Sequence, residues 1–133
     1  MADRQLTLAY LGNGKGANRY HIPFAMALPE LFRVKWIQAR HVDHSAWAAW
    51  PGVAYTTCLE DVLRDPEVDI VEVVTPAPAH YELAKRVLAS GKHCVVDKPF
   101  CASADEAEEA STVKETSCWR GSSIGAILGA SAA

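Results

Sequence analysis

The chain contains 133 residues, half of them apolar, and its 13 basic and 16 acidic side chains give a formal charge of −3. This composition is typical of a globular domain with one core and excludes a disordered or fibrous chain. The slight acidity argues against a general nucleic-acid binder, and no segment approaches the ~20 continuous apolar residues of a membrane-spanning helix. The N-terminus lacks the layout of a signal peptide, and the four cysteines form no C-x-x-C pair. We therefore expect a cytoplasmic protein with reduced thiols, no membrane contact and no nucleic-acid partner.

Strands and helices alternate along the sequence. Short apolar runs, several of them β-branched, predict strands, and longer amphipathic runs predict helices. The predicted strands cover 6–11, 32–39, 53–57, 69–75 and 93–96. The predicted helices cover 17–28, 59–64, 79–90 and 103–114, and 40–51 is either a short helix or a loop. This alternation predicts an α/β fold with a doubly wound parallel sheet, whose right-handed crossovers place helices on both faces.

Start and stop signals refine these elements. Pro23 lies inside the first predicted helix, which therefore either begins near residue 17 or begins near the proline. Gly91 suits the C-terminal cap of the helix over 79–90, and Ser103 with Glu106 has the spacing of a capping box. From Gly121 on, the sequence is mostly glycine, alanine and serine and predicts no further packed layer. We divide the chain into a domain over 1–110 and an atypical low-complexity tail over 111–133.

The glycine-rich turn after the first strand carries the strongest local sign of function. It matches G-x-G-x-x-A and reads Gly12-Asn13-Gly14-Lys15-Gly16-Ala17. The first glycine permits the tight turn, the second lets the backbone approach a pyrophosphate, and the alanine allows the helix to pack on the strand. The helix N-terminus and the lysine would add positive charge. We expect a dinucleotide to bind here, and the alternative is an ordinary glycine-rich turn.

The end of the second strand bears on the choice of dinucleotide. NAD sites usually place an acidic residue there, whereas this strand ends with Arg40 and His41, and Asp43 lies past the expected place. A guanidinium can hold a 2′-phosphate through two hydrogen bonds. We therefore expect NADP, with NAD as the alternative, and Arg40 and His41 as cofactor-binding residues. The other interpretation is a solvated strand end.

Two later strand ends complete the candidate site, because ligands of open parallel sheets bind beyond the carboxyl ends of strands. Thr75 and Pro76 are expected to border the cofactor, and His80 either binds it or caps and packs its own helix. Lys98 is expected to bind the nicotinamide ribose or a substrate hydroxyl, and Asp97 to pair with Lys98 and orient it. The alternative for Asp97 and Lys98 is a surface ion pair.

Other candidate residues carry weaker signals. His41 and His44 lie three residues apart without an evident third ligand, so no metal site is expected. Cys94 and Cys101 flank Lys98 without a partnered base and are predicted to pack. The tryptophans at 36, 47, 50 and 119 are predicted as core or cover residues.

With these motifs, the chain resembles the Gfo/Idh/MocA family of glucose–fructose oxidoreductase-like and inositol dehydrogenase-like enzymes. The resemblance runs from about Leu6 to Glu109 and rests on four segments of the sequence. Two of them depart from the family: Asp97 stands where the family usually has glutamate, and Ala77 stands where it often has asparagine. The four segments are the glycine-rich turn, RYHIP over 19–23, VVTPAPAH over 73–80 and ELAKRVLASGKHCVVDKPF over 82–100.

The resemblance implies a Rossmann-type cofactor domain and hydride transfer between a nicotinamide and a sugar, cyclitol or polyol, with Lys98 at the reacting centre. In the family, a second α/β domain brings most acid–base residues, the substrate pocket and commonly the dimer interface. The chain ends before such a domain, so we expect the cofactor-binding half, inactive alone, which binds a polyhydroxylated substrate only with a second domain. A homo-oligomer is possible. The alternatives are a non-catalytic dinucleotide-binding module and a fragment that folds poorly and self-associates.

Overall fold

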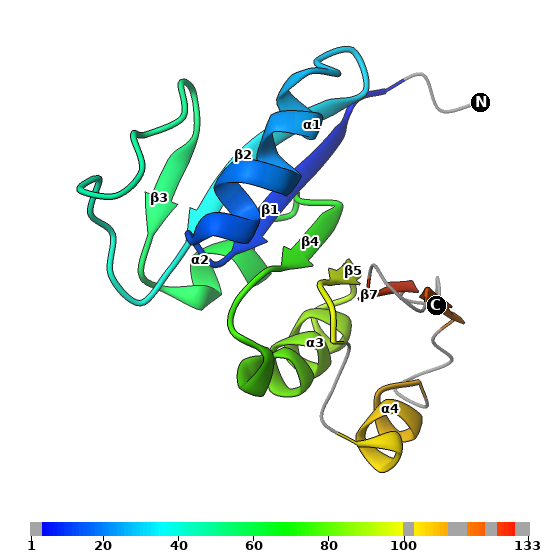
Figure 1. Cartoon of the computed structure of the whole chain (residues 1–133). Helices are drawn as coiled ribbons and strands as arrows, with labels where there is room; N and C mark the ends of the chain where they lie inside the picture. The colour runs from blue at the N-terminus through cyan, green and yellow to red at the C-terminus, as the bar shows by residue number, and fades with distance from the viewer. Residues whose placement is uncertain (1–3, 100–102, 112–116, 122–124, 130–133) are drawn as a thin grey trace.

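A seven-stranded sheet in the order β3-β2-β1-β4-β5-β7-β6 forms the centre of the molecule (Figure 1). The computed structural model describes residues 4–99, 103–111, 117–121 and 125–129. The strands are β1 (Leu6–Leu11), β2 (Phe32–Gln38), β3 (Ala54–Thr56), β4 (Ile70–Val73), β5 (His93–Val96), β6 (Ser117–Gly121) and β7 (Gly125–Gly129). The helical elements are η1 (Gly16–His21), α1 (Ile22–Met26), α2 (Leu59–Leu63), η2 (Ala77–Ala79), α3 (His80–Ala89) and α4 (Ala104–Ser111). Among these described helices, none is long and apolar enough to cross a membrane.

The first five strands are parallel, as the alternating sequence pattern predicts. Strand β1 lies at the centre of these five, between β2 and β4, and its residues alternate between two hydrophobic clusters. Ala9 and Leu11 pack with residues of α2 and α3, and Leu8 and Tyr10 pack with residues of η1 and α1. Figure 1 shows α1 lying across β1 and β2. Burial on both faces explains why β1 reads as a continuous apolar run, and it confirms the α/β, Rossmann-type fold with helices on both faces.

The helix predicted over 17–28 is split at Pro23. Residues Gly16–His21 form a π-helical turn, in which the N–H of Ile22 donates to the carbonyl of Ala17. The α-helix α1 then begins at Ile22 with Pro23 in its first turn. Because proline has no N–H to donate and its ring crowds the preceding turn, it suits a helix start and not a helix interior. The alternative start near Pro23 is therefore the better description of α1.

Most element boundaries follow the predicted start and stop signals. Gly91 adopts φ +87° just after α3, and its N–H donates to Leu88 O at 3.0 Å. The N–H of Glu106 donates to the Ser103 hydroxyl at 3.2 Å, as the capping-box spacing predicts. The segment 40–51 contains no helix and is a loop.

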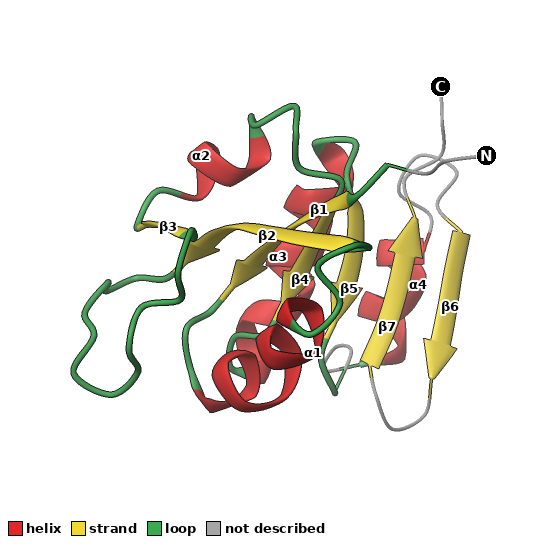
Figure 2. Ribbon diagram, turned by 90° about the horizontal axis from the view of Figure 1, so that it is seen from above, coloured by secondary structure: helices red, strands yellow, loops and turns green. Residues whose placement is uncertain are grey.

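The structure places two strands, β6 and β7, in the segment for which the sequence pattern predicts no element. Strand β7 pairs antiparallel with β5, with Val95 opposite Ile127, and β6 pairs antiparallel with β7. Figure 2 shows both strands at the edge of the sheet, beside β5. Pairing of this kind satisfies the backbone groups that an edge strand would otherwise leave open. Backbone pairing places little demand on side-chain type, so glycine-rich strands leave a weak sequence signal.

Candidate functional site

The carboxyl ends of four parallel strands meet at one edge of the sheet. The N–H of Gly12, after β1, donates to Gln38 O at the end of β2 at 2.7 Å. The N–H of Val74 donates to Leu11 O at 2.9 Å, and the N–H of Asp97 donates to Val73 O at 2.9 Å. These bonds bring the glycine-rich turn, the end of β2 and the segments after β4 and β5 together, as expected for the binding edge of a doubly wound sheet.

A cavity of about 590 Å³ lies over this edge. Five of its lining residues are predicted site residues, and they come from three separate segments: Gly12, Asn13, Arg40, Thr75 and Pro76. The sequence analysis did not single out the others, which are Gln38, Ala39, Pro78, Ala79, Glu82 and Leu83. The cavity is large enough to accept part of a nucleotide, since ligand pockets typically have volumes of ~300–1,000 Å³.

The glycines of the turn differ in what surrounds them. Gly12 has φ +116°, and a Cβ there would lie 2.8 Å from Val74 O, so the close approach of β1 to the end of β4 requires glycine. A Cβ on Gly14 would meet no atom of the described residues within 4 Å. The packing of the chain therefore gives no reason for glycine at 14, whereas a ligand lying on the backbone would.

The remaining residues of the turn are divided between core and surface. Ala17 is fully buried and packs with Leu8 and Tyr10, so its small size lets η1 lie close to β1. Lys15, in the middle of the turn, is exposed. A Cβ on Gly16 would lie 3.6 Å from the Asp97 carboxylate, so the turn also contacts the segment after β5.

Asn18 organises the glycine-rich turn. Its side-chain amide donates to the Asn13 side chain and to Gly14 O, both at 2.9 Å. Its Oδ1 accepts a hydrogen bond from Trp50 Nε1 at 2.9 Å, which ties the turn to the loop between β2 and β3. Asn18 is 7% exposed, and buried amides need such partners. The sequence analysis assigned no role to Asn18 and read Trp50 only as a core or cover residue.

Arg40 lies where the sequence analysis places a cofactor contact. Its side chain is exposed and lines the cavity directly after β2. His41 is also exposed but does not line the cavity. Asp43 accepts hydrogen bonds from the hydroxyl and the N–H of Ser45, and the hydroxyl contact lowers the pKa of Asp43. Arg40 is thus the charged residue at the end of β2 that borders the cavity.

His80 supports the site from inside the protein. The residue is 1% exposed, with Nδ1 2.6 Å from Pro99 O and Nε2 2.8 Å from Thr75 O. The ring therefore links the segment after β4 to the segment after β5. Of the two interpretations of His80, this geometry favours packing, because the buried ring has almost no surface with which to contact a ligand.

The Asp97 carboxylate lies beside the glycine-rich turn and makes different contacts from those predicted. Its Oδ1 accepts a hydrogen bond from the backbone N–H of Lys98 at 2.9 Å and lies 3.7 Å from His21 Nε2. Among the contacts of the described residues, none joins the Asp97 carboxylate to the Lys98 ammonium. The Lys98 side chain is exposed. The predicted pairing of the Asp97 carboxylate with the Lys98 ammonium is therefore not seen among the described residues, and Asp97 contacts the Lys98 backbone instead.

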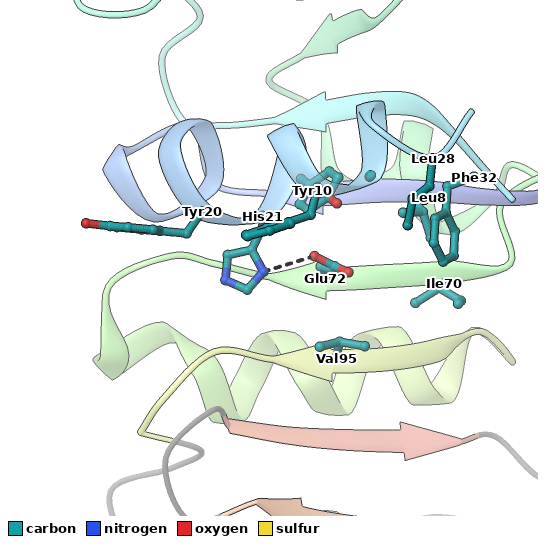
Figure 3. Close-up of a pocket in the computed structure, with 11 residues that line it drawn as sticks. Leu8, Tyr10, Tyr20, His21, Leu28, Phe32, Ile70, Glu72 and Val95 are labelled. Atoms are coloured by element: carbon teal, nitrogen blue, oxygen red, sulfur yellow. Dashed lines mark ion pairs between the residues drawn. The ribbon is translucent and has the colours of Figure 1, made fainter. Parts of the chain in front are cut away.

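A second cavity, of about 320 Å³, lies beside η1 and α1 over β1, β4 and β5. Figure 3 shows His21 turned toward Glu72 of β4, and the ion pair joins Nδ1 to Oε2 at 3.3 Å. Contact with Glu72 raises the pKa of His21, and the charge of Asp97 adds to this effect, whereas burial opposes it. Burial, followed by the charge of Glu72, raises the pKa of Tyr10. Sequence reasoning missed this group, although Glu72 is the one charged residue inside the strand segment IVEV.

Comparisons with known proteins agree with this geometry. The family model of the Gfo/Idh/MocA oxidoreductases, described as an NAD-binding Rossmann fold, matches residues 6–119. The chain is 36% identical over 105 residues to the uncharacterized oxidoreductase YhhX of Escherichia coli, which covers 78% of this chain and 30% of YhhX. It is 29% identical over 103 residues to IolW of Bacillus subtilis, a scyllo-inositol 2-dehydrogenase (NADP(+)). This match covers 77% of this chain and 28% of IolW. The chain thus spans about 30% of the length of these curated relatives.

Solved structures show the same similarity. The crystal structure of YhhX superposes with a TM-score of 0.79 at 34% identity, covering 83% of this chain and 32% of that one. GenD2 from gentamicin A biosynthesis, in complex with NAD, superposes with a TM-score of 0.72 at 30% sequence identity. The match covers 80% of this chain and 30% of the GenD2 chain. KijD10, a 3-ketoreductase from Actinomadura kijaniata, in complex with NADP, superposes with a TM-score of 0.70 at 27% sequence identity. The match covers 80% of this chain and 33% of the KijD10 chain. The protein therefore belongs to the Gfo/Idh/MocA oxidoreductase family, and this chain is its NAD(P)-binding Rossmann domain.

Proposed function

We propose that this chain is the cofactor-binding part of an oxidoreductase that prefers NADP to NAD. The proposed reaction is hydride transfer between the nicotinamide and a hydroxyl-bearing carbon of a sugar, cyclitol or polyol. The observation that carries the proposal is the cavity of about 590 Å³. The glycine-rich turn, Arg40 and the Thr75–Pro76 segment all line it.

The residues of this cavity fit a dinucleotide. The open space over Gly14 allows a pyrophosphate to lie on the backbone, and Asn18 holds the turn in shape for it. Thr75 and Pro76 border the same cavity. The bound dinucleotide would supply the hydride acceptor or donor. The chain's own residues bind it and fix its orientation, which matters because hydride transfer needs close contact of the two carbons.

The preference for NADP rests on Arg40. An exposed guanidinium lines the cavity at the end of β2, where NAD sites usually present a carboxylate to the ribose. The Glu82 carboxylate also lines the cavity, but it comes from α3 and not from β2. A guanidinium suits a 2′-phosphate because it donates two parallel hydrogen bonds to it. The NADP named for IolW and KijD10 supports this choice, and the NAD bound to GenD2 represents the alternative.

We assign the catalytic contact to Lys98, with Asp97 holding its loop. Asp97 follows β5 at the binding edge, lies close to Gly16 and accepts the Lys98 N–H. Lys98 is exposed on the same loop, so its ammonium is free to bind the nicotinamide ribose or a substrate hydroxyl. The polyol class of substrate is supported by the cyclitol named for IolW.

The free thiols of Cys58 and Cys94 support a cytoplasmic location.

The test is a calorimetric titration of the chain with NADPH and with NADH. We expect tighter binding of NADPH, and we expect Arg40→Asp to weaken NADPH binding at least about tenfold, because a hydrogen-bonded charge contact is lost. NADH binding should change much less. Arg64→Asp is the matched control, because Arg64 is exposed directly after α2, does not line this cavity, and its substitution changes the charge by the same amount.

Three outcomes would contradict parts of the proposal. Equal losses for both nucleotides in Arg40→Asp would remove Arg40 as the 2′-phosphate contact. A wild-type preference for NADH would overturn the choice of cofactor. Binding of neither nucleotide by the wild-type chain would overturn the proposed function itself.

A further inference from the structure

The imidazole of His21 bridges two carboxylates from different parts of the sheet. Its Nδ1 lies 3.3 Å from Glu72 Oε2, and its Nε2 lies 3.7 Å from Asp97 Oδ1. The three side chains are 25%, 17% and 32% exposed, so none of them is freely solvated. A neutral imidazole carries one N–H and presents a lone pair at its other nitrogen, whereas the imidazolium donates from both nitrogens. Only the protonated ring therefore suits both carboxylates.

Glu72 needs a positive partner at this place. It projects from β4 into the second cavity, whose walls include Phe24, Ile70 and Val95. Its Oε2 is buried and has no hydrogen-bond partner among the described residues. A buried carboxylate without a counter-charge is strongly unfavourable. His21 faces it and supplies a positive charge when its ring is protonated, and contact with Glu72 raises the pKa of His21.

The other side of the bridge reaches the proposed cofactor site. The Asp97 carboxylate that faces His21 also accepts the backbone N–H of Lys98 at 2.9 Å. Its second oxygen lies 3.6 Å from the place that a Cβ on Gly16 would occupy. His21 itself ends η1, the element that Gly16 begins. The ring thus joins the end of η1 to the loop that carries Lys98.

We propose that His21 is a positioning residue for the Asp97–Lys98 loop, and that the protonated ring sets this loop for tight dinucleotide binding. The inference rests on the function proposed above. The titratable and charged groups that face the ring within the described residues are Glu72 from β4 and Asp97 after β5, with Tyr10 of β1 next to Glu72 and Lys98 on the neighbouring loop. Because the folded chain raises the pKa of His21, the bridge is fully formed below its unfolded pKa and is lost as the pH rises through the folded value. Dinucleotide affinity should fall over that same interval.

The experiment measures the Kd for NADH against pH in the whole chain. NADH serves because its pyrophosphate does not titrate near neutrality, whereas the 2′-phosphate of NADPH does, with a pKa of ~6. We expect wild-type affinity to fall about tenfold as His21 loses its proton, the usual scale of one charge-assisted hydrogen bond. His21→Gln should bind at the weaker level throughout and show no such pH step. His93→Gln is the matched control, since His93 is exposed at the opposite end of β5 from Asp97.

A second variant separates positioning from a general structural role. Glu72→Gln removes one carboxylate and should lower the pKa of His21, which NMR of the ring protons measures directly. The midpoint of the affinity step should move to lower pH by the same interval. A wild-type pH profile retained in His21→Gln, or an affinity midpoint that does not follow the ring in Glu72→Gln, would overturn the inference and leave the proposed function standing. Failure of the wild-type chain to bind any nucleotide at any pH would overturn both.

Discussion

The two glycines that flank Asn13, to which the motif gives different roles, also have different surroundings in the structure. At Gly12, φ is +116° and a Cβ would lie 2.8 Å from a backbone oxygen of Val74. We expect Gly12→Ala to lower the free energy of unfolding by roughly 2–6 kcal/mol, because an unfavourable φ and overpacking each cost about 1–3 kcal/mol. Gly14→Val should leave stability and far-UV circular dichroism nearly unchanged and abolish NADPH binding, since its side chain would enter open space over the backbone.

Chemical denaturation and nucleotide titration of the two variants check this contrast. Similar losses of stability in both would show that Gly14 is also required by the fold. Retained nucleotide affinity in Gly14→Val would place the dinucleotide elsewhere.

The sequence was enough to predict that residues following the ends of different strands lie close together, because this does not depend on where each side chain points. Gly12, Arg40 and Thr75 meet at one cavity because the carboxyl ends of parallel strands share an edge. The direction of a single side chain was harder to predict. His80 begins α3 and turns into the protein, where two carbonyl oxygens hold it. Glu72 is a charged residue within an apolar strand, but its partner His21 lies far away in the sequence, so only the fold reveals the pair.

At the scale of elements, Asn18 connects η1, the glycine-rich turn and the loop between β2 and β3. Its side chain makes three hydrogen bonds, to Asn13, Gly14 and Trp50, and the residue is only 7% exposed. We expect Asn18→Ala to lower the free energy of unfolding by about 1–3 kcal/mol, since it removes the hydrogen bonds of a buried amide and leaves the partly buried side chains of Asn13 and Trp50 without this partner. It should also speed hydrogen exchange in the turn and weaken NADPH binding. Trp50→Phe is the control that removes one of the three bonds, and an unchanged exchange rate in Asn18→Ala would contradict the role.

Elements with strong burial were predictable, and elements defined by backbone geometry were not. Strands β1, β4 and β5 read clearly because apolar side chains cover both faces of the sheet. The π-helical turn η1 depends on where Pro23 interrupts the helix, and the sequence gives two possible starts. Strands β6 and β7 depend on the open edge of β5, a non-local feature that no periodicity within 117–129 records.

At the scale of the whole molecule, one face combines helix α1 with exposed apolar side chains. Tyr20, Phe24, Leu28 and Leu31 are 56%, 72%, 40% and 51% exposed, and the first three line the cavity beside His21. Apolar patches of this kind favour association. We expect the chain to self-associate at high concentration and Phe24→Glu to reduce light scattering at equal stability. Ala46→Glu, an exposed position in the loop between β2 and β3, is the matched control. Equal scattering by Phe24→Glu and the wild-type chain would contradict a role for this face.

The hydrogen bond from Trp50 to Asn18 places an intrinsic fluorophore beside the glycine-rich turn. The indole is one hydrogen bond away from the residue that shapes the glycine-rich turn. Tryptophan emission overlaps the absorption of reduced nicotinamide, so energy transfer would quench this fluorophore when NADPH or NADH occupies the cavity. Comparison with Trp50→Phe separates its emission from that of the other three tryptophans, one of which, Trp36, donates to Asp65 elsewhere in the fold. Arrival of the cofactor can thus be followed in real time by ultraviolet fluorescence, without a dye or a label on either molecule.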